Sequence, residues 1–278
     1  MKISILGCGW LGFPLAKSLV EKGFLVKGST TSKNKLSILS TAEIHPYLIS
    51  VNENKIVGDF DAFLENSEIL IIDIPPKLRG GFSDTSTTLS MPFVSKIKNL
   101  IPLIEKSTVS KVIFVSSTSV YADSNSEITE NTKPQPDTES GKQLIEAERL
   151  LLSNSTFQTT VVRFGGLIGE DRHPIYFLAG RQNIENPDAP INFIHQKDCI
   201  GIIEEILNQI QNDYIKGNEI FNAVTPFHPT RKDYYTQKGI ELNLPLPEFD
   251  NSKPSVGKLI LSKKVEKVLG YHFKEILL

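Results

Sequence analysis

Apolar residues along the chain follow two alternating patterns. Short continuous runs rich in Ile, Leu and Val are followed by longer stretches in which apolar residues recur with a helical period. The runs expected to form strands are residues 2–6, 24–27, 47–51, 68–74 and 111–115, and the helical stretches are residues 13–22, 34–40, 60–64 and 89–105. Continuous apolar runs fit strands that are covered on both faces, as in parallel sheets. The alternation therefore predicts an α/β fold with a doubly wound parallel sheet.

The junction between the first strand and the first helix is rich in glycine. Gly7-Cys8-Gly9-Trp10-Leu11-Gly12 has the spacing G-x-G-x-x-G, directly after a strand and at the start of a helical pattern. In this context the glycines permit a tight turn, close approach of a diphosphate and close helix–strand packing, with the phosphates at the helix N-terminus. The alternative is a turn that needs glycine for packing alone, but the context favours dinucleotide binding. The expected contacts are Gly7, Gly9, Trp10, Leu11 and Gly12.

The end of the second strand bears on the choice of cofactor. In NAD-binding sheets an acidic residue about 20 positions beyond the glycines accepts hydrogen bonds from the ribose hydroxyls. No Asp or Glu lies between Gly23 and Ala42, and the strand is followed instead by hydroxyls and a lysine: Ser29, Thr30, Thr31, Ser32 and Lys33. Donors of this kind suit a 2'-phosphate, so we expect NADP, with NAD as the alternative. A solvent-exposed Ser/Thr turn would explain the same residues.

Ligands of doubly wound sheets bind outside the carboxyl ends of the strands. Ile74 and Pro75 end the fourth expected strand, and Ser116 and Ser117 end the fifth. We expect Ile74 and Pro75 to contact the cofactor. Residues 77–88 follow without periodicity and are long for a connection in a compact domain. They fit a binding or lid loop and a disordered surface loop equally well.

Composition narrows the function classes. The chain has 278 residues and a formal charge of −2, which gives no general electrostatic case for binding nucleic acid or an anionic membrane. The longest apolar runs fall short of the ~18 residues of a membrane span, and the chain enters a strand directly without a leader-like segment, so we expect a cytoplasmic protein. Cys8 and Cys199 make neither a disulfide framework nor a metal cluster, and both fit packing roles.

At residues 116–121 the pattern Ser-Ser-x-x-Val-Tyr resembles the extended branch of the short-chain dehydrogenase/reductase superfamily, the NAD(P)-dependent epimerases, dehydratases and reductases of nucleotide sugars. Further matches lie at residues 161–169, a sixth strand, 191–198, a return segment, 199–211, a helix, and 219–223, a late strand. The resemblance implies a Rossmann domain over residues 1–170, to which residues 193–212 return. It also implies a small C-terminal substrate lobe over residues 171–278.

The same resemblance implies roles for single residues. Ser117 falls where the family keeps its catalytic Ser or Thr, and Ser116 and Phe164 fall among the expected cofactor contacts. The family's base is Tyr-x-x-x-Lys, in which residues one helical turn apart share a face and the ammonium stabilises a phenolate. Counting back from Lys142 gives Thr138. Threonine cannot supply this proton transfer, so the pattern resembles the atypical, YeeZ-like group of extended short-chain reductases, in which Lys142 can still bind the nicotinamide ribose.

Other side chains are candidates for the missing proton donor. Tyr176 follows the sixth strand and is the better placed of the free tyrosines, whereas Tyr121 belongs to the Val-Tyr packing element. Tyr234-Tyr235-Thr236-Gln237-Lys238 repeats the Tyr-x-x-x-Lys spacing outside its structural context, which indicates a chance match. For His195 we favour a hydrogen-bonded structural role over acid–base work. Asp198 is expected to cap a helix that begins at Cys199.

Substrate contacts are expected between residues 170 and 190, where Arg172, His173 and Arg181 lie close together. Guanidinium groups bind carboxylate or phosphate in a bidentate manner, so an acidic or nucleotide-linked substrate would fit, although an exposed basic loop explains these residues equally well.

Three functions follow. The first is an NADP-dependent epimerase or dehydratase acting on a small, sugar-like hydroxylated metabolite, with Ser117 polarising the reacting oxygen. The second is a non-catalytic NADP-binding sensor or regulatory protein, and the third is a reductase in which water or substrate supplies the proton. The partners expected are a small-molecule substrate and, as one option, a second copy of the chain, with no metal.

Overall fold

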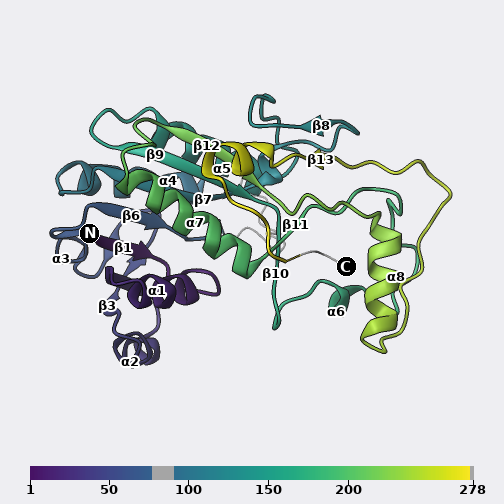
Figure 1. Cartoon of the computed structure of the whole chain (residues 1–278), viewed down its shortest axis with the longest axis horizontal. Helices are drawn as coiled ribbons and strands as arrows, with labels where there is room; N and C mark the ends of the chain where they lie inside the picture. The colour runs from purple at the N-terminus through teal and green to yellow at the C-terminus, as the bar shows by residue number, and fades with distance from the viewer. Residues whose placement is uncertain (77–90, 276–278) are drawn as a thin grey trace.

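A seven-stranded parallel sheet forms the centre of the molecule (Figure 1). The structure is a computed structural model that describes residues 1–76 and 91–275. The strand order is β12-β9-β7-β6-β1-β2-β3. The bounds are β1 (Lys2–Leu6), β2 (Leu25–Thr30), β3 (His45–Leu48), β6 (Ile69–Ile72), β7 (Lys111–Ser117), β9 (Gln158–Phe164) and β12 (Glu219–Ala223). The predicted doubly wound α/β fold is therefore confirmed.

Helices cover both faces of this sheet. The helices beside it are α1 (Gly12–Glu21), α2 (Leu36–Thr41), α3 (Phe60–Leu64), α4 (Pro92–Glu105), α5 (Glu139–Leu152) and α7 (Gln196–Gln211). Alternate residues of each strand point to opposite faces. In β6, Ile69 and Ile71 pack with α1, α2 and α7, while Leu70 and Ile72 pack with α3, α4 and α5. The continuous apolar runs of the sequence thus supply two separate cores.

The chain reverses its direction of winding between β1 and β6. From β1 the sheet grows through β2 and β3 on one side and through β6, β7, β9 and β12 on the other. The connections that follow β1 and β6 therefore run to opposite sides, and the crevice expected at such a switch point is where ligands of these sheets bind.

A smaller lobe lies at the far end of the molecule from α1 and α2 (Figure 1). It contains α6 (Ile175–Leu178) and α8 (Arg231–Glu241), and the short strands β10 (Gly166–Ile168) and β11 (Phe193–His195) join it to the sheet. Its own core is small and consists of Ile168, Ile175, Ile191, Tyr234 and Tyr235.

Two further pairs of short strands lie outside the sheet: β8 (Glu127–Ile128) with β13 (Leu259–Ile260), and β4 (Ser50–Val51) with β5 (Ile56–Val57).

Some element bounds differ from those expected. The strand expected at residues 47–51 is divided, because β3 ends at Leu48 and Ser50–Val51 turns back to pair with β5. A π-helical segment, η3 (Val265–Leu269), follows β13. The edge strand β12 lies within the range expected for the lobe, so the central sheet extends past residue 170. Residues 77–88 fall outside the described chain. No helix among the described residues is long and apolar enough to span a bilayer.

Candidate functional site

The glycines of the turn after β1 have two different roles. Two of them are needed for packing, and one leaves open space. Gly7 has a φ of +109°, and a Cβ there would lie 2.3 Å from the carbonyl oxygen of Asp73. A Cβ on Gly12 would lie 2.2 Å from the carbonyl oxygen of Gly7. A Cβ on Gly9 would meet nothing within 4 Å. Gly7 and Gly12 are thus fixed by the protein's own backbone, whereas the open space at Gly9 fits the approach of a ligand.

The N-terminus of α1 opens onto the same turn. Leu11 occupies the N-cap without a side-chain cap, and the first turn of α1 carries no acidic residue. Within the described part of the chain the N–H groups of Trp10 and Leu11 have no acceptor. Unpaired N–H groups at a helix N-terminus form a natural site for phosphate. The residues present therefore fit the diphosphate of a dinucleotide.

Some hydroxyl groups at the end of β2 accept hydrogen bonds from the backbone, and others are exposed. The Ser29 hydroxyl accepts a hydrogen bond from Gly7 N at 2.9 Å, which ties β2 to the glycine turn. Thr30 Oγ1 accepts from Ser32 N at 3.2 Å. Thr31 and Lys33 are exposed, and Lys33 begins the short 3-10 helix η1 (Lys33–Lys35). The exposed groups at the end of β2 that could contact a ligand are thus lysine ammonium groups and the Thr31 hydroxyl.

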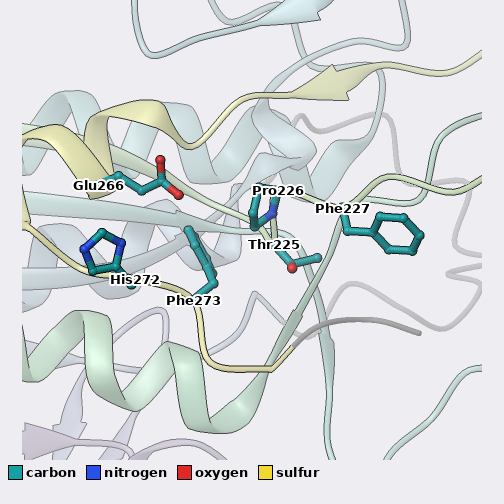
Figure 2. Close-up of a pocket in the computed structure, with 6 residues that line it drawn as sticks. All are labelled: Thr225, Pro226, Phe227, Glu266, His272 and Phe273. Atoms are coloured by element: carbon teal, nitrogen blue, oxygen red, sulfur yellow. The ribbon is translucent and has the colours of Figure 1, made fainter.

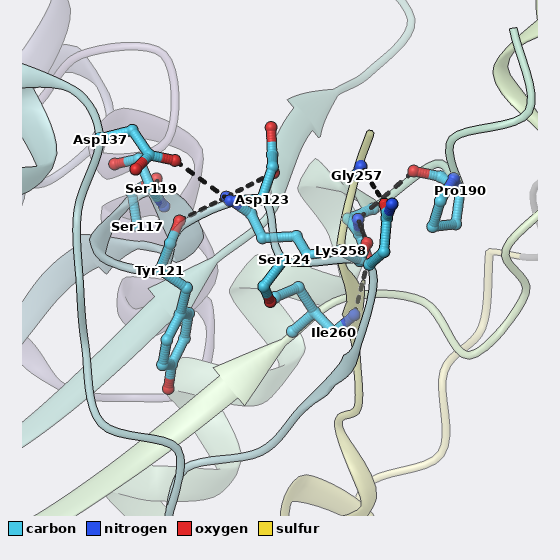
Figure 3. Close-up of polar contacts among 12 residues, drawn as sticks. Ser117, Ser119, Tyr121, Asp123, Ser124, Asp137, Pro190, Gly257, Lys258 and Ile260 are labelled. Atoms are coloured by element: carbon cyan, nitrogen blue, oxygen red, sulfur yellow. Dashed lines mark hydrogen bonds and ion pairs between the residues drawn. The ribbon is translucent and has the colours of Figure 1, made fainter. Parts of the chain in front are cut away.

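Ser116 and Ser117 point to different environments, because successive side chains of a strand alternate. Ser116 is buried, and its hydroxyl donates to Glu148 Oε1 at 2.5 Å. Ser117 ends β7 and begins the 3-10 helix η2 (Thr118–Val120), where its Oγ accepts from Ser119 N at 3.1 Å. The Ser117 hydroxyl hydrogen is left to donate elsewhere. Figure 3 shows this region, in which the Asp137 carboxylate accepts from Asp123 N at 3.1 Å.

The Thr138 hydroxyl caps the helix that carries Lys142. It is the N-cap of α5, and its Oγ1 accepts from Gly141 N at 3.1 Å. A Cβ on Gly141 would lie 2.2 Å from Ser119 O, so the first turn of α5 packs directly on η2. Lys142 follows in that turn and is exposed. The fold thereby places the start of α5 against the segment that begins at Ser117.

A buried ion pair underlies this part of the site. Arg163 of β9 is 2% exposed and Glu148 of α5 is 0% exposed. Arg163 Nε lies 3.1 Å from Glu148 Oε1, and Nη2 lies 2.5 Å from Oε2. Arg163 Nη1 donates to the Tyr121 hydroxyl, which in turn lies 3.0 Å from Asn222 Oδ1 of β12. With Ser116 of β7, which also bonds to Glu148, the network joins three strands and α5.

Trp10 connects the glycine turn to the segment after β10. Its indole Nε1 donates to Asp171 Oδ1 at 2.9 Å, and the Arg172 guanidinium lies 5.0 Å from the ring centroid. A Cβ on Gly169 would lie 2.8 Å from the indole, and Gln196 Nε2 donates to Trp10 O at 2.6 Å. A pocket of about 420 Å³ lies beside Trp10, between the glycine turn and the start of α7. Arg172 therefore has a defined partner.

The other expected substrate residues lie on the lobe. His173 Nδ1 accepts from Ile175 N at 3.1 Å, and its Nε2 lies 2.8 Å from the Tyr234 hydroxyl. Burial lowers the pKa of His173 to about 4, so the ring is neutral near pH 7. Tyr234 is buried in the lobe core, far along the chain from Ser117. Tyr176 on α6 is 58% exposed and Arg181 is exposed.

The prediction that Asp198 caps a helix beginning at Cys199 is wrong. Helix α7 begins at Gln196, and its N-cap is His195, whose Nδ1 accepts from Lys197 N. This contact accords with the structural role favoured for His195. The buried Asp198 carboxylate instead accepts from the Tyr271 hydroxyl at 2.7 Å, Lys274 N at 2.8 Å and Glu275 N at 3.2 Å. Asp198 therefore anchors the C-terminal segment.

That anchored segment forms one wall of a second pocket, of about 340 Å³. Figure 2 shows Glu266, His272 and Phe273 on its C-terminal side, with Thr225, Pro226 and Phe227 opposite them. Thr225 to Phe227 directly follow β12. The C-terminal segment thus reaches the carboxyl edge of the sheet.

Sequence reasoning missed two charged residues near the crevice. Lys258 Nζ donates to Tyr121 O at 2.6 Å and lies 3.1 Å from Asp123 Oδ1 (Figure 3). Asn192 holds the same segment, because its Nδ2 donates to Lys258 O at 2.7 Å and its Oδ1 accepts from Ile260 N at 2.9 Å. The other is Asp73, which directly follows β6 and borders the glycine turn. An acid immediately after a buried strand was the signal that could have revealed Asp73.

Comparisons with known proteins identify a relative in sequence and several neighbours in fold. No family model matches it. The chain is 32% identical over 276 residues to Protein YeeZ of Escherichia coli K12, covering 98% of this chain and 96% of the relative. The solved UDP-glucuronic acid 4-epimerase of Bacillus cereus, in complex with UDP-glucuronic acid and NAD, superposes with a TM-score of 0.80 at 17% identity, over 100% of this chain and 95% of that chain.

A conserved protein of unknown function from Silicibacter pomeroyi superposes with a TM-score of 0.76 at 18% identity, over 99% of this chain and 94% of that chain. At these identities the two solved structures establish the fold alone.

Proposed function

The chain belongs to the YeeZ family, and from that premise we propose that it binds NADP and acts on a small, sugar-like hydroxylated metabolite as an epimerase, dehydratase or reductase. The observation that carries the proposal is the glycine turn. Gly9 leaves open space beside the N–H groups of Trp10 and Leu11, which directly precede α1 and are unpaired among the described residues. Structural neighbours of the same fold are described in complex with NAD.

The preference for NADP rests on charge at the end of β2. The region offers Thr31, Lys33 and Lys35 and lacks an acidic residue between Gly23 and Ala42. A carboxylate there would bind the ribose hydroxyls of NAD but repel a 2'-phosphate, whereas lysine side chains attract the phosphate.

In this proposal the nicotinamide, when bound, would accept or return a hydride. Ser117 donates its hydroxyl hydrogen to the reacting substrate oxygen, and Lys142 binds the nicotinamide ribose. The Thr138 hydroxyl does not ionise near neutral pH, and it already caps α5. The substrate or water therefore supplies the proton that a tyrosine supplies in the related enzymes.

The same cap favours a second candidate, an NADP-binding protein without turnover. Because the Thr138 hydroxyl bonds to Gly141 N, the residue at the usual base position has a structural role. Cofactor occupancy would then set the conformation of the lobe for a partner.

Calorimetric titration with NADP⁺ and NAD⁺ tests the cofactor. We expect tighter binding of NADP⁺, with Lys33→Ala reducing that affinity about tenfold and leaving NAD⁺ affinity unchanged, the loss of roughly one charge-assisted contact. Lys142→Ala should weaken the binding of both cofactors. Lys106→Ala, a control at the exposed end of α4, should weaken the binding of neither. Equal affinity for the two cofactors would contradict the choice of NADP.

Turnover separates the two candidates. Protein with NADP⁺ or NAD⁺ is mixed with UDP-glucuronic acid, the ligand of a structural neighbour, and absorbance at 340 nm and product isomers are followed. Reduced cofactor or a new isomer that disappears in Ser117→Ala supports an enzyme. Cofactor binding without turnover across a panel of nucleotide sugars supports the sensor.

A further inference from the structure

Asp73 lies at the junction of β6, the glycine turn and α1. Its N–H donates to Leu6 O at 2.9 Å, which continues the pairing of β6 with β1. Its carbonyl oxygen fills the space that a Cβ on Gly7 would need, and its Oδ2 lies 3.0 Å from the position of a Cβ on Gly12. Burial raises the pKa of the Asp73 carboxyl group, and the nearby Gly12 N–H, the first of α1, opposes this rise. A carboxyl group thus stands at the helix end where the diphosphate is proposed to bind.

Among residues 1–76 and 91–275, no charged side chain neutralises a negative charge on Asp73. Among the described residues, the titratable groups that face it are the thiols of Cys8 on the turn and Cys199 on α7. The negative charge of Asp73 contributes to the raised pKa of both thiols. Burial raises the pKa of Cys8 to about 12 and raises that of Cys199 well above its usual value, so both thiols are neutral. Among the described residues no Lys or Arg side chain makes an ion pair with Asp73. The backbone N–H of Gly12 is its principal stabilising partner.

A charged Asp73 and a diphosphate would compete for the same helix terminus. Helix α1 offers one positive end, and two anions beside it repel each other in surroundings of low dielectric constant. Burial raises the pKa of Asp73 to about 7, against the smaller opposing effect of the Gly12 hydrogen bond. Both charge states of the carboxyl group are therefore populated near neutral pH.

We propose that Asp73 couples cofactor binding to proton uptake: the dinucleotide binds the form of the protein in which the Asp73 carboxyl group is protonated. This inference rests on the proposed NADP binding and adds to it a residue that sets the pH range of that binding. Protonation removes the competing charge and turns one carboxyl oxygen from an acceptor into a donor.

The coupling has a defined size. If only the protonated form binds, the apparent Kd rises about tenfold for each pH unit above the pKa, because the competent fraction falls tenfold. Binding then takes up close to one proton per cofactor at the upper end of this range.

Calorimetric titration of the full chain with NADP⁺ at pH 7, 8 and 9 tests the coupling. The 2'-phosphate, with a pKa of about 6, is fully ionised throughout this range. We expect the Kd to rise about tenfold from pH 8 to pH 9, and two buffers of different ionisation enthalpy should reveal uptake of about one proton at pH 9. Asp73→Asn should bind at pH 9 as tightly as at pH 7.

Asp213→Asn is the matched control, because it changes the net charge equally. Asp213 is exposed after α7 and has a φ of +58°, which asparagine tolerates. It should keep the pH dependence of the original chain. A pH-independent Kd without proton uptake, or an unchanged slope in Asp73→Asn, would overturn the coupling while leaving NADP binding intact. Failure to bind NADP⁺ even at pH 7 would overturn the proposed function as well. If Asp73→Asn does not fold, the measured proton uptake by the original chain still decides whether cofactor binding is coupled to protonation.

Discussion

The two sides of the crevice are built by different means. On the cofactor side, the glycine turn is held by backbone atoms that leave no room for a side chain, as at Gly7 and Gly12. On the side proposed to face the substrate, Tyr121, four residues after Ser117, is held by side chains from distant segments, Arg163 and Lys258. Rigid geometry on the first side comes from steric exclusion, and on the second it comes from hydrogen bonds and buried charge.

This difference teaches where each side is vulnerable. Steric exclusion tolerates no larger residue at its key positions, however conservative the substitution. A polar network tolerates changes of size but fails when one partner of a buried pair loses its charge. Three substitutions test the contrast, on the cofactor side, on the substrate-facing side and at the joint between them.

Gly7→Ala should have the largest effect. The added Cβ would lie 2.3 Å from Asp73 O at a φ of +109°, so β6 must shift away from β1. We expect a loss of about 4 kcal/mol in the free energy of unfolding, measured by urea denaturation, together with loss of cofactor binding. Gly217→Ala, where a Cβ meets nothing within 4 Å, is the control and should change little. Normal stability of Gly7→Ala would refute steric exclusion as the cause of this geometry.

Glu148→Gln should follow, with a loss of about 3 kcal/mol, because it leaves the buried Arg163 guanidinium without a compensating charge. Glu146→Gln on the same helix is the matched control. Glu146 pairs with Arg149 at 2.6 Å, but the Arg149 side chain is 63% exposed, so solvent screens this pair and its loss should lower stability far less. Equal losses in the two variants, measured by the same denaturation, would show that burial does not decide the strength of these pairs.

Trp10→Phe should have the smallest effect of the three. It removes the indole N–H that donates to Asp171 and weakens the contact with Arg172, at a cost of about 1 kcal/mol. Circular dichroism is the suitable measurement, because Trp10 is the one tryptophan of the chain. In Asp171→Asn the side-chain oxygen can still accept the bond, so its stability should stay closer to that of the original chain. A larger loss in Asp171→Asn than in Trp10→Phe would argue against this hydrogen bond as the stabilising contact.

The sequence predicted the fold around the glycine turn better than the contacts near Ser117 for a physical reason. The parallel sheet and the glycine turn follow from local patterns of apolar residues and glycine. Lys258 and Tyr121 lie 137 positions apart, and no local pattern pairs them.

The expected cap at Asp198 failed for the same reason. His195 and Asp198 can both cap a helix, and the choice depends on residues 271–275, which give Asp198 other partners. The location of Thr138 relative to Lys142 was predicted from spacing, but its use as the α5 cap required the structure.

The bonds from Asp198 to the C-terminal segment also bear on how the molecule folds during synthesis. Residues 271–275 leave the ribosome after every strand of the central sheet, yet they complete the shell around the start of α7. The sheet up to β9 can assemble from neighbouring segments, whereas this closing contact spans more than 70 residues and forms late. Until that contact forms, the buried carboxylate of Asp198 lacks three donors, and the start of α7, which lines the pocket beside Trp10, lacks its C-terminal cover.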